Sequence, residues 1–429
     1  MTTDAYGLPL TTASSTAGAA YDRAAHGLLG WDGAALDMFQ ATIAQDPGLA
    51  LGHAGAGVCL FLEERFAEAR TAVTEARARV AAASPRERSH VEALALLVTG
   101  KVAEAETLMR EHLAAWPRDL VIAQRLYFIW FWQGRFPDLL DLTTDLMRRV
   151  GGGPFLPGLH AFALEQAGRC AEAVRLAEGA LAANSRDAWG VHALAHALFE
   201  QAAFDAGVEA LPGRIEPCTH LGWFRNHLLW HLALMHLSRG EYGRVLAMSH
   251  SVFEREPSSI AGNLHDSISL LWRLMLAGHD VRTRWVPFVE IAHERLDRQG
   301  LLFHAVHLAM ALAGGGDWTT AAQQVDMLRA RTAKDRTGLI ADVVLPLIRG
   351  IHAFARAEYA DTIRAIEPLT PRIVELGGSR AQRDVFHDTL LEACFRAGDM
   401  DRAERLVAAR IARRPDHQWT TRKTRPAAS

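Results

Sequence analysis

The sequence predicts an all-α fold, a right-handed α-solenoid of about nine helix pairs curved around a concave inner cleft. Three observations predict it. Apolar residues recur at helical spacing along almost the whole chain, which is rich in Ala, Leu, Arg and Glu. The alternating Val, Ile and Thr runs that are typical of strands are nearly absent. Short turn segments recur along the chain, as a helical repeat requires.

The turn segments are expected to join the two helices of each pair. The clearest are "LVTGKVAEAE", "FWQGRFPDLL", "EQAGRCAEAV", "LSRGEYGRVL", "MLAGHDVRTR" and "FRAGDMDRAERL", and weaker copies are "LEERFAEART", "EQAAFDAGVE", "AGGGDWTTAA" and "ARAEYADTIR". Gly100, Gly134 and Gly168 lie 34 residues apart, the period of a tetratricopeptide (TPR) helix pair. Glycine at the turn permits a left-handed residue between the helices. No pair can bury its apolar face alone, so neighbouring pairs are expected to stack.

Composition excludes several classes of function. The chain has 429 residues, 49% of them hydrophobic, and a formal net charge of -3, which does not suit a nucleic-acid partner. No apolar run is long enough for a membrane helix, and the N-terminus lacks the pattern of a secretion signal. The four cysteines are far apart and form no CxxC pair, so a zinc ribbon or redox motif is not supported and a cytoplasmic location fits.

The chain is expected to divide into three parts. Residues 1–18 are interpreted as a flexible N-terminal segment, and residues 19–415 as a single TPR-like solenoid in which two lobes could meet near 203–222. Residues 416–429, which include the basic run "TTRKTRPAAS", are interpreted as a disordered tail. Periodicity does not separate a monomer from a homodimer.

The stretch "NHLLWHLALMHL" carries three histidines on an otherwise apolar helix. When the turn residue Gly240 is counted as position fifteen, His227 and Trp230 fall on the concave face and His231 on its flank, while His236 is packed between helices. In the preceding repeat, His192 and His196 fall on the same inner face, one helical turn apart.

The next two repeats continue this pattern with His265, Asp266, Trp272 and Arg273, and then with His304 and His307. A single histidine on an apolar helix is usually a core residue, and that interpretation is given to His53, His90, His160, His236 and His352. The adjacent inner set is different because several buried polar side chains need partners, which stacked repeats rarely provide in such number. This set therefore indicates a binding site.

Metal binding is kept only as an alternative. His192 with His196 and His227 with His231 are HxxxH pairs, the spacing at which a helix offers two imidazoles to one ion. No HExxH glutamate accompanies them, and no GxSxG elbow or phosphate-binding glycine motif is present, so no cofactor is expected.

Several segments together resemble the tetratricopeptide repeat protein 38 family. They are, in chain order, "RERSHVEALALLVTG", "WPRDL", "AFALEQAGR", "RDAWGVHALAHAL", "HLLWHLALMHLSRGEY", "SISLLWRLMLAG", "MALAGGGDW" and "GGSRAQRDVF". The resemblance spans the chain from Asp46 to Pro415 and implies an all-helical repeat fold without an established reaction. The segment from Ala202 to Gly222 departs from the family pattern, so the resemblance does not predict the shape of that wall of the cleft.

The resemblance marks positions that coincide with the inner set. They are His192 and His196 in "HALAH", Trp230 and His231 in "WHLALMHL", Trp272 and Arg273 in "LLWRL", His307 before "MA", and Gln382, Arg383 and Asp384 in "AQRD". By its place at the start of the last repeat, "AQRD" is expected to close one end of the groove with a guanidinium and a carboxylate.

Two functions follow as hypotheses. In the first, the cleft binds a small anionic or polar molecule, and acid–base catalysis would use His192 and His231 with Asp266 or Asp384 as an orienting partner. The ligand-binding residues would be His196, His227, Trp230, Trp272, Arg273, His307, Gln382, Arg383 and Asp384. In the second, the groove binds a peptide or protein partner, the common use of such repeats. Whether the chain is an enzyme stays open.

Overall fold

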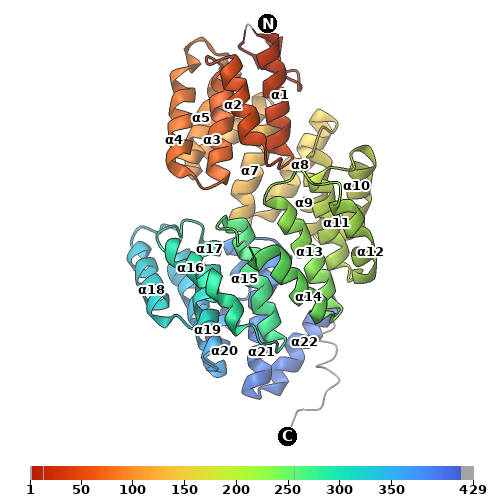
Figure 1. Ribbon diagram of the computed structural model, residues 1–429, viewed down its shortest axis with the longest axis vertical. Helices are drawn as coiled ribbons and strands as arrows, with labels where there is room; N and C mark the ends of the chain where they lie inside the picture. Colours follow the sequence, from red (N-terminus) through yellow and green to blue (C-terminus); the bar gives the residue numbers. More distant parts are fainter. Residues whose placement is uncertain (1, 13, 256, 417–429) are drawn as a thin grey trace. The chain divides into compact units, whose positions relative to one another are not determined.

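The computed structural model describes residues 2–12, 14–255 and 257–416 of the chain, and most of this part is helical (Figure 1). The all-α solenoid of TPR-like helix pairs predicted from the sequence is confirmed. The first half contains β1 (Thr2–Thr3), β2 (Pro9–Leu10), α1 (Ser15–Leu29), α2 (Ala35–Gln45), α3 (Ala50–Leu62), α4 (Phe66–Ala78), η1 (Val80–Ala82), α5 (Pro85–Val98), α6 (Val102–Ala115), α7 (Leu120–Trp132), α8 (Phe136–Val150), α9 (Leu156–Gln166), α10 (Cys170–Ala183) and α11 (Ala188–Glu200).

The second half continues with helices only, some of them interrupted by short 3-10 or π segments. These elements are α12 (Phe204–Ile215), α13 (Phe224–Ser238), α14 (Tyr242–Met248), η2 (Ser249–Glu254), α15 (Ala261–Leu276), η3 (Arg282–Trp285), α16 (Val286–Glu294), α17 (Leu302–Gly315), α18 (Trp318–Thr332), η4 (Ile340–Val344), α19 (Leu345–Ala355), α20 (Tyr359–Ile366), η5 (Glu367–Leu369), η6 (Ile373–Leu376), α21 (Arg380–Ala397) and α22 (Met400–Arg413).

The described residues hold 22 α-helices, which makes eleven successive pairs, more than the roughly nine expected from the repeat period. All ten turn segments named from the sequence lie between the first and second helix of a pair. The additional pair is α1 and α2, whose connection "GWDGA" does not follow the pattern of the other turns. The ten named turn segments correspond to the other ten pairs.

The turn between the helices of a pair contains one left-handed residue at a fixed position. Gly100, Gly134 and Gly168 have φ of 80°, 69° and 81°, as the glycine pattern predicted. In three weaker copies of the turn, the same position is held by Glu64, Ala202 or Ala357, with φ of 61°, 56° and 62°. The backbone geometry is therefore kept where glycine is absent, at the steric cost that a Cβ atom brings in this region.

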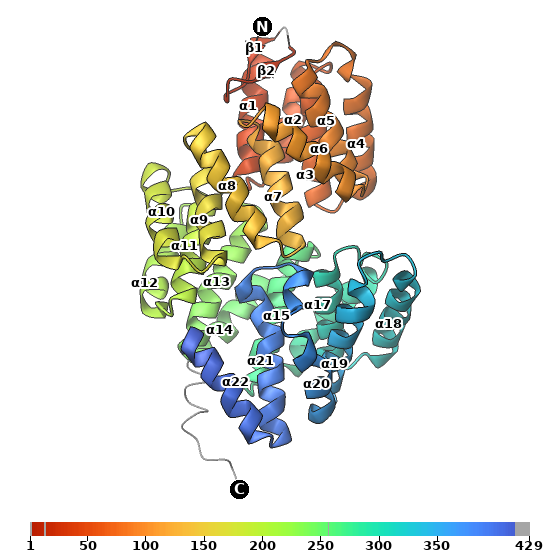
Figure 2. The same cartoon turned by 180° about the vertical axis from the view of Figure 1, so that it is seen from behind.

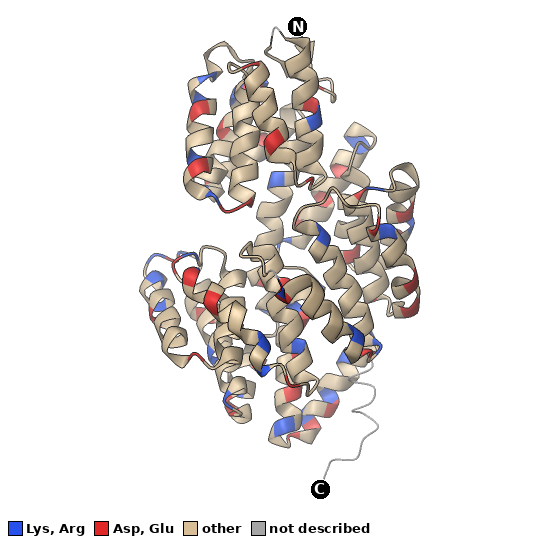
Figure 3. Cartoon of the chain, viewed as in Figure 1, with Lys and Arg blue, Asp and Glu red and all other residues tan. Residues whose placement is uncertain are grey.

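First and second helices of a pair are buried differently. In α7, nearly every residue is buried, and its sequence "LVIAQRLYFIWFW" is apolar on all sides. In α8, the buried residues Phe136, Leu139, Thr143 and Leu146 form one stripe at intervals of three and four. First helices are therefore buried on most sides, whereas second helices are buried along one stripe. Acidic and basic residues are interspersed along the second helices (Figure 3).

The chain divides into two compact units. Unit 1 comprises residues 1–131, 136–194 and 216–225, and unit 2 comprises residues 132–135, 195–215 and 226–429. The division passes through the region near 203–222, where two lobes were expected to meet, and it also passes through α11 between Leu194 and Ala195.

The N-terminal residues differ from the flexible segment that the sequence suggested. Thr2–Thr3 pairs with Pro9–Leu10 in an antiparallel hairpin, and α1 begins at Ser15 (Figure 2). Asp4 is buried because its carboxylate accepts backbone N–H groups within the hairpin and lies beside Arg86. Of the predicted tail, residues 417–429 lie outside the described residues, whereas Asp416 is buried and contacts Arg414. No described helix is long and apolar enough to cross a membrane.

Candidate functional site

The inner residues named from the sequence come from five first helices, and all of them are buried. His192 and His196 lie on α11, His227, Trp230 and His231 on α13, Asp266, Trp272 and Arg273 on α15, His307 on α17, and Gln382, Arg383 and Asp384 on α21. Their exposed fractions range from 0% to 9%. All except His192 belong to unit 2. The set is therefore an interior polar cluster rather than the lining of an exposed surface.

Three imidazoles of unit 2, those of His196, His227 and His231, are called the imidazole cluster from here on. The ring centroids of His196 and His231 are 4.2 Å apart, those of His227 and His231 are 4.7 Å apart, and both ring pairs meet edge to face. The Nε2 atoms of His227 and His231 are 3.2 Å apart. His227 and His231 are separated by one turn of α13, which places both rings on one face of the helix.

Asp266 on α15 orients this cluster. Its Oδ2 accepts a hydrogen bond of 2.8 Å from Nδ1 of His227, which leaves Nε2 of His227 with the lone pair. Oδ1 of Asp266 is buried and has no hydrogen-bond partner among the described residues. Burial lowers the pKa of His196 well below its ordinary value, and the nearby cationic groups of Arg380 and Arg414 lower it further. The imidazole of His196 is therefore neutral near pH 7.

Trp230 forms a flat wall beside the imidazole cluster. Its indole stacks on the ring of His227, with centroids 5.5 Å apart and planes 16° apart. The guanidinium of Arg273 lies 5.7 Å from the indole. The indole Nε1 is buried without a hydrogen-bond partner among the described residues.

Trp272 and Arg273 are engaged by the protein itself rather than directed at a ligand. Trp272 donates a hydrogen bond of 2.9 Å from Nε1 to the hydroxyl of Thr389. Arg273 donates to the carbonyl of Ala381 at 2.7 Å and to that of Ser269 at 3.2 Å, which ties α15 to the start of α21. Burial lowers the pKa of Arg273 to about 10, so the side chain stays charged near pH 7.

The "AQRD" residues also have structural partners. Gln382 and Ser379 form a capping box at the start of α21, in which each side chain binds the other's backbone N–H. The guanidinium of Arg383 donates to the carbonyl of Gly378. Asp384 accepts from Arg413, the last residue of the C-terminal helix, and from Arg414, which follows it. Burial alone would raise the pKa of Asp384, but Arg410, Arg414 and Arg413 hold it well below the ordinary value. Instead of closing a groove, this segment anchors α22 and the residues after it.

A second group of polar side chains lies around α17 in unit 2. Arg295 donates from Nε to Nε2 of His304 at 2.9 Å, and Nδ1 of His304 is 3.0 Å from Nε2 of His265. Because a guanidinium only donates, His304 must carry its proton on Nδ1 and donate to His265, whose proton is then on Nδ1. Nδ1 of His265 is buried without a hydrogen-bond partner among the described residues. The sequence analysis did not identify Arg295, because its position outside a first helix gave no signal.

His307 is placed beside this second group. Its Nδ1 donates to the carbonyl of Phe303 at 2.9 Å, one turn earlier on α17. Its ring centroid lies 4.9 Å from that of His265. Burial lowers the pKa of His307 to about 4, so the imidazole is neutral in its helix.

His192, the remaining catalytic candidate, belongs to unit 1. Its ring stacks on Phe162 with centroids 4.9 Å apart, and it contacts the rings of Trp189 and Phe224. His192 and His231 therefore lie in different units, and the aromatic surroundings of His192 differ from the polar surroundings of His231.

Unit 1 contains a buried ionic group that the sequence analysis did not recognise. Oδ2 of Asp119, at the start of α7, accepts from Arg86 at 2.7 Å, from His90 at 2.8 Å and from His112 at 3.0 Å. Burial alone would raise the pKa of Asp119, but Arg86 and the two imidazoles hold it well below the ordinary value. His90 is thus buried, as expected, but in an ion-paired group rather than in an apolar core. In the sequence, the segment "WPRDL" contains Asp119 and is the feature from which this group could have been predicted.

Unit 1 also binds a segment of its own chain. The loop after α1, residues 29–33, lies against α7 and α11. The carbonyl of Leu29 accepts a hydrogen bond of 2.9 Å from the amide of Gln124 and one of 3.0 Å from the indole of Trp189. The N–H of Gly33 donates to the carbonyl of His220 at 2.9 Å. No periodic pattern marks this loop, so sequence analysis missed it.

Trp31 at the centre of this loop lies among four aromatic side chains. Its indole stacks on Phe224, with centroids 5.2 Å apart and planes 13° apart, and meets Phe128 and Trp223 edge to face. Trp189 completes the group at 6.0 Å. Trp31 has φ of 61°, and its Nε1 has no hydrogen-bond partner among the described residues.

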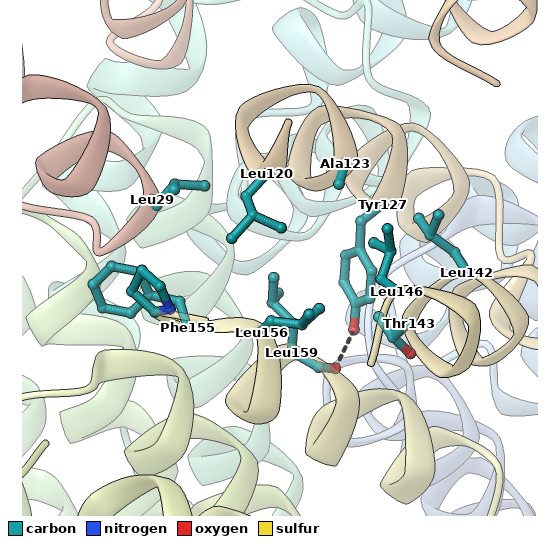
Figure 4. A pocket seen from close by; sticks show the side chains of 11 residues that line it. Leu29, Leu120, Ala123, Tyr127, Leu142, Thr143, Leu146, Phe155, Leu156 and Leu159 are labelled. Carbon is teal, nitrogen blue, oxygen red and sulfur yellow. Dashed lines mark hydrogen bonds between the residues drawn. The ribbon is translucent and has the colours of Figure 1, made fainter. Parts of the chain in front are cut away.

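A small cavity of about 10 Å³ also lies in unit 1 (Figure 4). Its lining is apolar apart from Tyr127 and Thr143, and Tyr127 donates to the carbonyl of Leu159 at 3.3 Å. This volume suits about one water molecule. It is too small for an organic ligand.

No family model matches the chain. Among solved structures, it is similar to one described as Naa15/Naa10 bound to HypK-THB, with 11% identity and a TM-score of 0.25, over 91% of this chain and 62% of that chain. It is also similar to the TPR domain of P58(IPK), with 15% identity and a TM-score of 0.19, over 83% of this chain and 100% of that chain. This chain thus spans 62% of the length of the first structure.

Proposed function

We propose that the chain is a TPR-like binding protein whose inner helix faces in unit 1 recognise a peptide segment of a protein partner. Stacked helix pairs are commonly used in this way, because their inner faces form extended binding surfaces. The motifs that resemble the tetratricopeptide repeat protein 38 family support membership of that family as part of the same proposal. The family suggests no reaction, so none is assigned.

The observation that carries this proposal is the loop of residues 29–33. Two side-chain donors from first helices, Gln124 and Trp189, bind one main-chain carbonyl of the loop. An aromatic group receives the side chain of Trp31, and the loop makes a short antiparallel bridge between Asp32 and Leu221. Main-chain hydrogen bonds combined with a side-chain pocket are the means by which repeat and sheet surfaces bind extended peptides. The loop occupies unit 1 as such a peptide would.

The loop has features of a ligand that can be displaced. Trp31 adopts a left-handed backbone conformation, which costs a non-glycine residue roughly 1–2 kcal/mol. Its indole N–H is buried without a hydrogen-bond partner in the part of the chain that the structure describes, which costs about 1–3 kcal/mol more. A partner peptide that presents an aromatic side chain without these costs would compete with the loop. We therefore expect the partner segment to contain a tryptophan or another large aromatic residue.

The test uses the full chain with Trp31→Ala, which vacates the aromatic group, and a fluorescein-labelled peptide of residues 28–34, "LLGWDGA". Anisotropy titration is expected to show binding at least about tenfold tighter to this variant than to the native protein, equivalent to about 1.4 kcal/mol. The peptide "LLGADGA" should not bind, and Gln124→Ala combined with Trp31→Ala should weaken binding. Trp318→Ala, which removes an indole from unit 2, serves as the control.

Equal binding of both peptides, or no binding to a Trp31→Ala protein that melts cooperatively, would overturn the proposal. If Trp31→Ala unfolds unit 1, Trp31→Leu keeps an apolar side chain in the aromatic group and allows the same titration. Hydrogen exchange of α7 and α11 reports whether the variant remains folded.

A second candidate is favoured by a specific observation in unit 2. The buried atoms Oδ1 of Asp266, Nε1 of Trp230 and Nδ1 of His265 have no hydrogen-bond partners among the described residues. Native proteins rarely leave so many buried polar atoms unsatisfied, so a small polar or anionic molecule could supply the missing partners. In that case His231 would transfer a proton, and Asp266 would orient the imidazoles through His227.

A thermal-shift screen against metabolites tests this candidate. A ligand that raises the melting temperature of the native protein, and not that of His231→Gln, would support a small-molecule site in unit 2. If the same ligand stabilises both proteins equally, the imidazole cluster is not its site.

A further inference from the structure

The imidazole cluster has the geometry of a metal-ligand set. One nitrogen from each of His196, His227 and His231 lies within 4.8 Å of the others, and all three side chains are buried. They come from two first helices of unit 2, α11 and α13, so their positions are fixed by regular secondary structure. A buried site on rigid helices can hold ligands without a flexible loop.

The distance between the ring nitrogens of two of these histidines fits the binding of a single metal ion. The Nε2 atoms of His227 and His231 are 3.2 Å apart. Two nitrogens that each lie about 2.0–2.1 Å from one tetrahedral zinc are about 3.4 Å apart. The two nitrogens would therefore need to move apart only slightly to bind the same zinc ion. Without a metal, the same contact requires a proton between the two nitrogens.

Asp266 occupies the position of an outer partner to a metal ligand. It accepts the Nδ1 proton of His227 at 2.8 Å, which fixes the tautomer and directs the Nε2 lone pair toward His231. A carboxylate in this position makes the imidazole a better donor to a cation and supplies a compensating negative charge.

The surrounding charges do not prevent a cation from binding. Arg414 lies near the cluster, but its guanidinium is paired with Glu200 at 2.7 Å and with Asp384 at 2.5 Å. Arg273 donates to the backbone carbonyls of Ser269 and Ala381, and its guanidinium lies 5.7 Å from the indole of Trp230. Each of these cations therefore has its own acceptors, and Asp266 is the carboxylate that faces the imidazoles.

The other group of histidines and acid in the described residues is less suitable. In unit 1, His90, His112 and Asp119 also lie close together. The same oxygen of Asp119 that faces both histidines already accepts from Arg86 at 2.7 Å. A divalent cation there would be placed against a buried guanidinium, which Coulomb repulsion disfavours strongly in a low-dielectric interior. The contrast points to unit 2.

We propose that unit 2 binds one first-row divalent transition metal, with zinc the best fit, through His196, His227 and His231, with Asp266 as the outer partner of His227. Three imidazole nitrogens are a donor set that zinc accepts in proteins. The nitrogen-only donor set favours zinc, cobalt, nickel or copper over magnesium or calcium, which prefer oxygen. This site is independent of the peptide-binding face proposed for unit 1.

The test uses the full chain, produced without a histidine tag, stripped with a chelator and dialysed with zinc or with cobalt(II). Elemental analysis should find one metal per chain, and the zinc form should melt at a higher temperature than the stripped form. Cobalt should give the visible absorption of a tetrahedral nitrogen-ligated ion, without thiolate charge-transfer bands. Competition with a chromophoric chelator gives the affinity.

The variants separate this site from adventitious binding. His231→Gln and His196→Gln keep the side-chain volume and should each abolish stoichiometric cobalt absorption. Asp266→Asn should retain one metal per chain but weaken binding about 10–100-fold. His236→Gln is the matched control, since His236 is a buried histidine of the same helix that pairs with Glu241 outside the cluster, and it should bind as the native protein does.

The proposal is overturned if the native chain takes up no stoichiometric metal, or if His231→Gln and His236→Gln bind it equally. Thiolate bands in the cobalt spectrum would also overturn it, because they would place the metal on cysteine. If a variant fails to fold, the cobalt spectrum of the native protein and the Asp266→Asn affinity still decide the outcome.

Discussion

Asp119 is the buried acid on which a group of cationic and polar side chains in unit 1 depends. Its Oδ2 atom alone accepts from Arg86, His90 and His112 at 2.7–3.0 Å, and its side chain is almost fully buried. The substitution Asp119→Asn keeps the shape but removes the negative charge. The guanidinium of Arg86 then retains only Asp4, at 3.2 Å, as a carboxylate partner.

The expected loss of stability follows from this geometry. Removing one member of a buried ion pair typically costs about 3–5 kcal/mol, because the remaining charge has lost both water and its partner. Since Asp4 still faces Arg86, we expect the lower end of this range, about 3 kcal/mol. For a unit of this size, that loss lowers the melting temperature by about 6–12 °C.

Calorimetry measures the melting temperature of the unfolding transition. Hydrogen exchange of α5 and α7 shows whether the loss of stability occurs in unit 1, and the helices of unit 2 serve as an internal reference. The double variant Asp119→Asn with Arg86→Met removes both charges, so its loss should be smaller than the sum of the two single losses by at least about 1 kcal/mol. A shift below about 2 °C for Asp119→Asn, or simple additivity in the double variant, would refute the reasoning.

Two further predictions concern unit 2. Ala357→Gly places glycine at a left-handed turn residue, φ 62°, and should raise the free energy of unfolding by about 1 kcal/mol, whereas Gly398→Ala, φ 76°, should lower it by about as much. Urea unfolding measures both values, and changes of the same sign in the two variants would contradict this account. Burial lowers the pKa of His307 from 6.5 to about 4. Between pH 6.5 and pH 4, the unfolded chain therefore binds a proton on this residue that the folded chain does not bind. The free energy of unfolding of unit 2 should therefore fall by about 3 kcal/mol, because of this residue, as the pH falls from 6.5 to 4. The melting temperature of His307→Gln should accordingly depend less on pH than that of the native protein.

The repeat turns illustrate what could be predicted from local sequence. A glycine between two amphipathic segments specifies a left-handed residue, because other residues pay a steric cost there, and seven of the ten named turns contain such a glycine. Helical phase also identified the buried inner positions, since side chains one turn apart share a face. The phase could not distinguish a residue that lines an open groove from one that is enclosed by packing.

The partners of the inner residues depended on contacts between distant parts of the chain. Trp272 binds Thr389, and Arg273 binds the carbonyl of Ala381, across more than a hundred residues of sequence. Asp384, expected to face a ligand, is instead satisfied by arginines of α22. Sequence spacing describes one helix at a time, so it carries no information on which acceptor a buried donor will meet.

The sequence by itself determined that this protein is an all-α repeat of helix pairs, that its inner helices carry imidazoles, and that His227 and His231 share one face, because these features follow from local periodicity. Tertiary structure alone decided that Asp266 orients His227, that Arg295 and His304 set the tautomer of His265, and that residues 29–33 occupy unit 1. Hydrogen bonds and aromatic contacts depend on distances of a few ångströms between separate helices, and only the packing of those helices sets such distances.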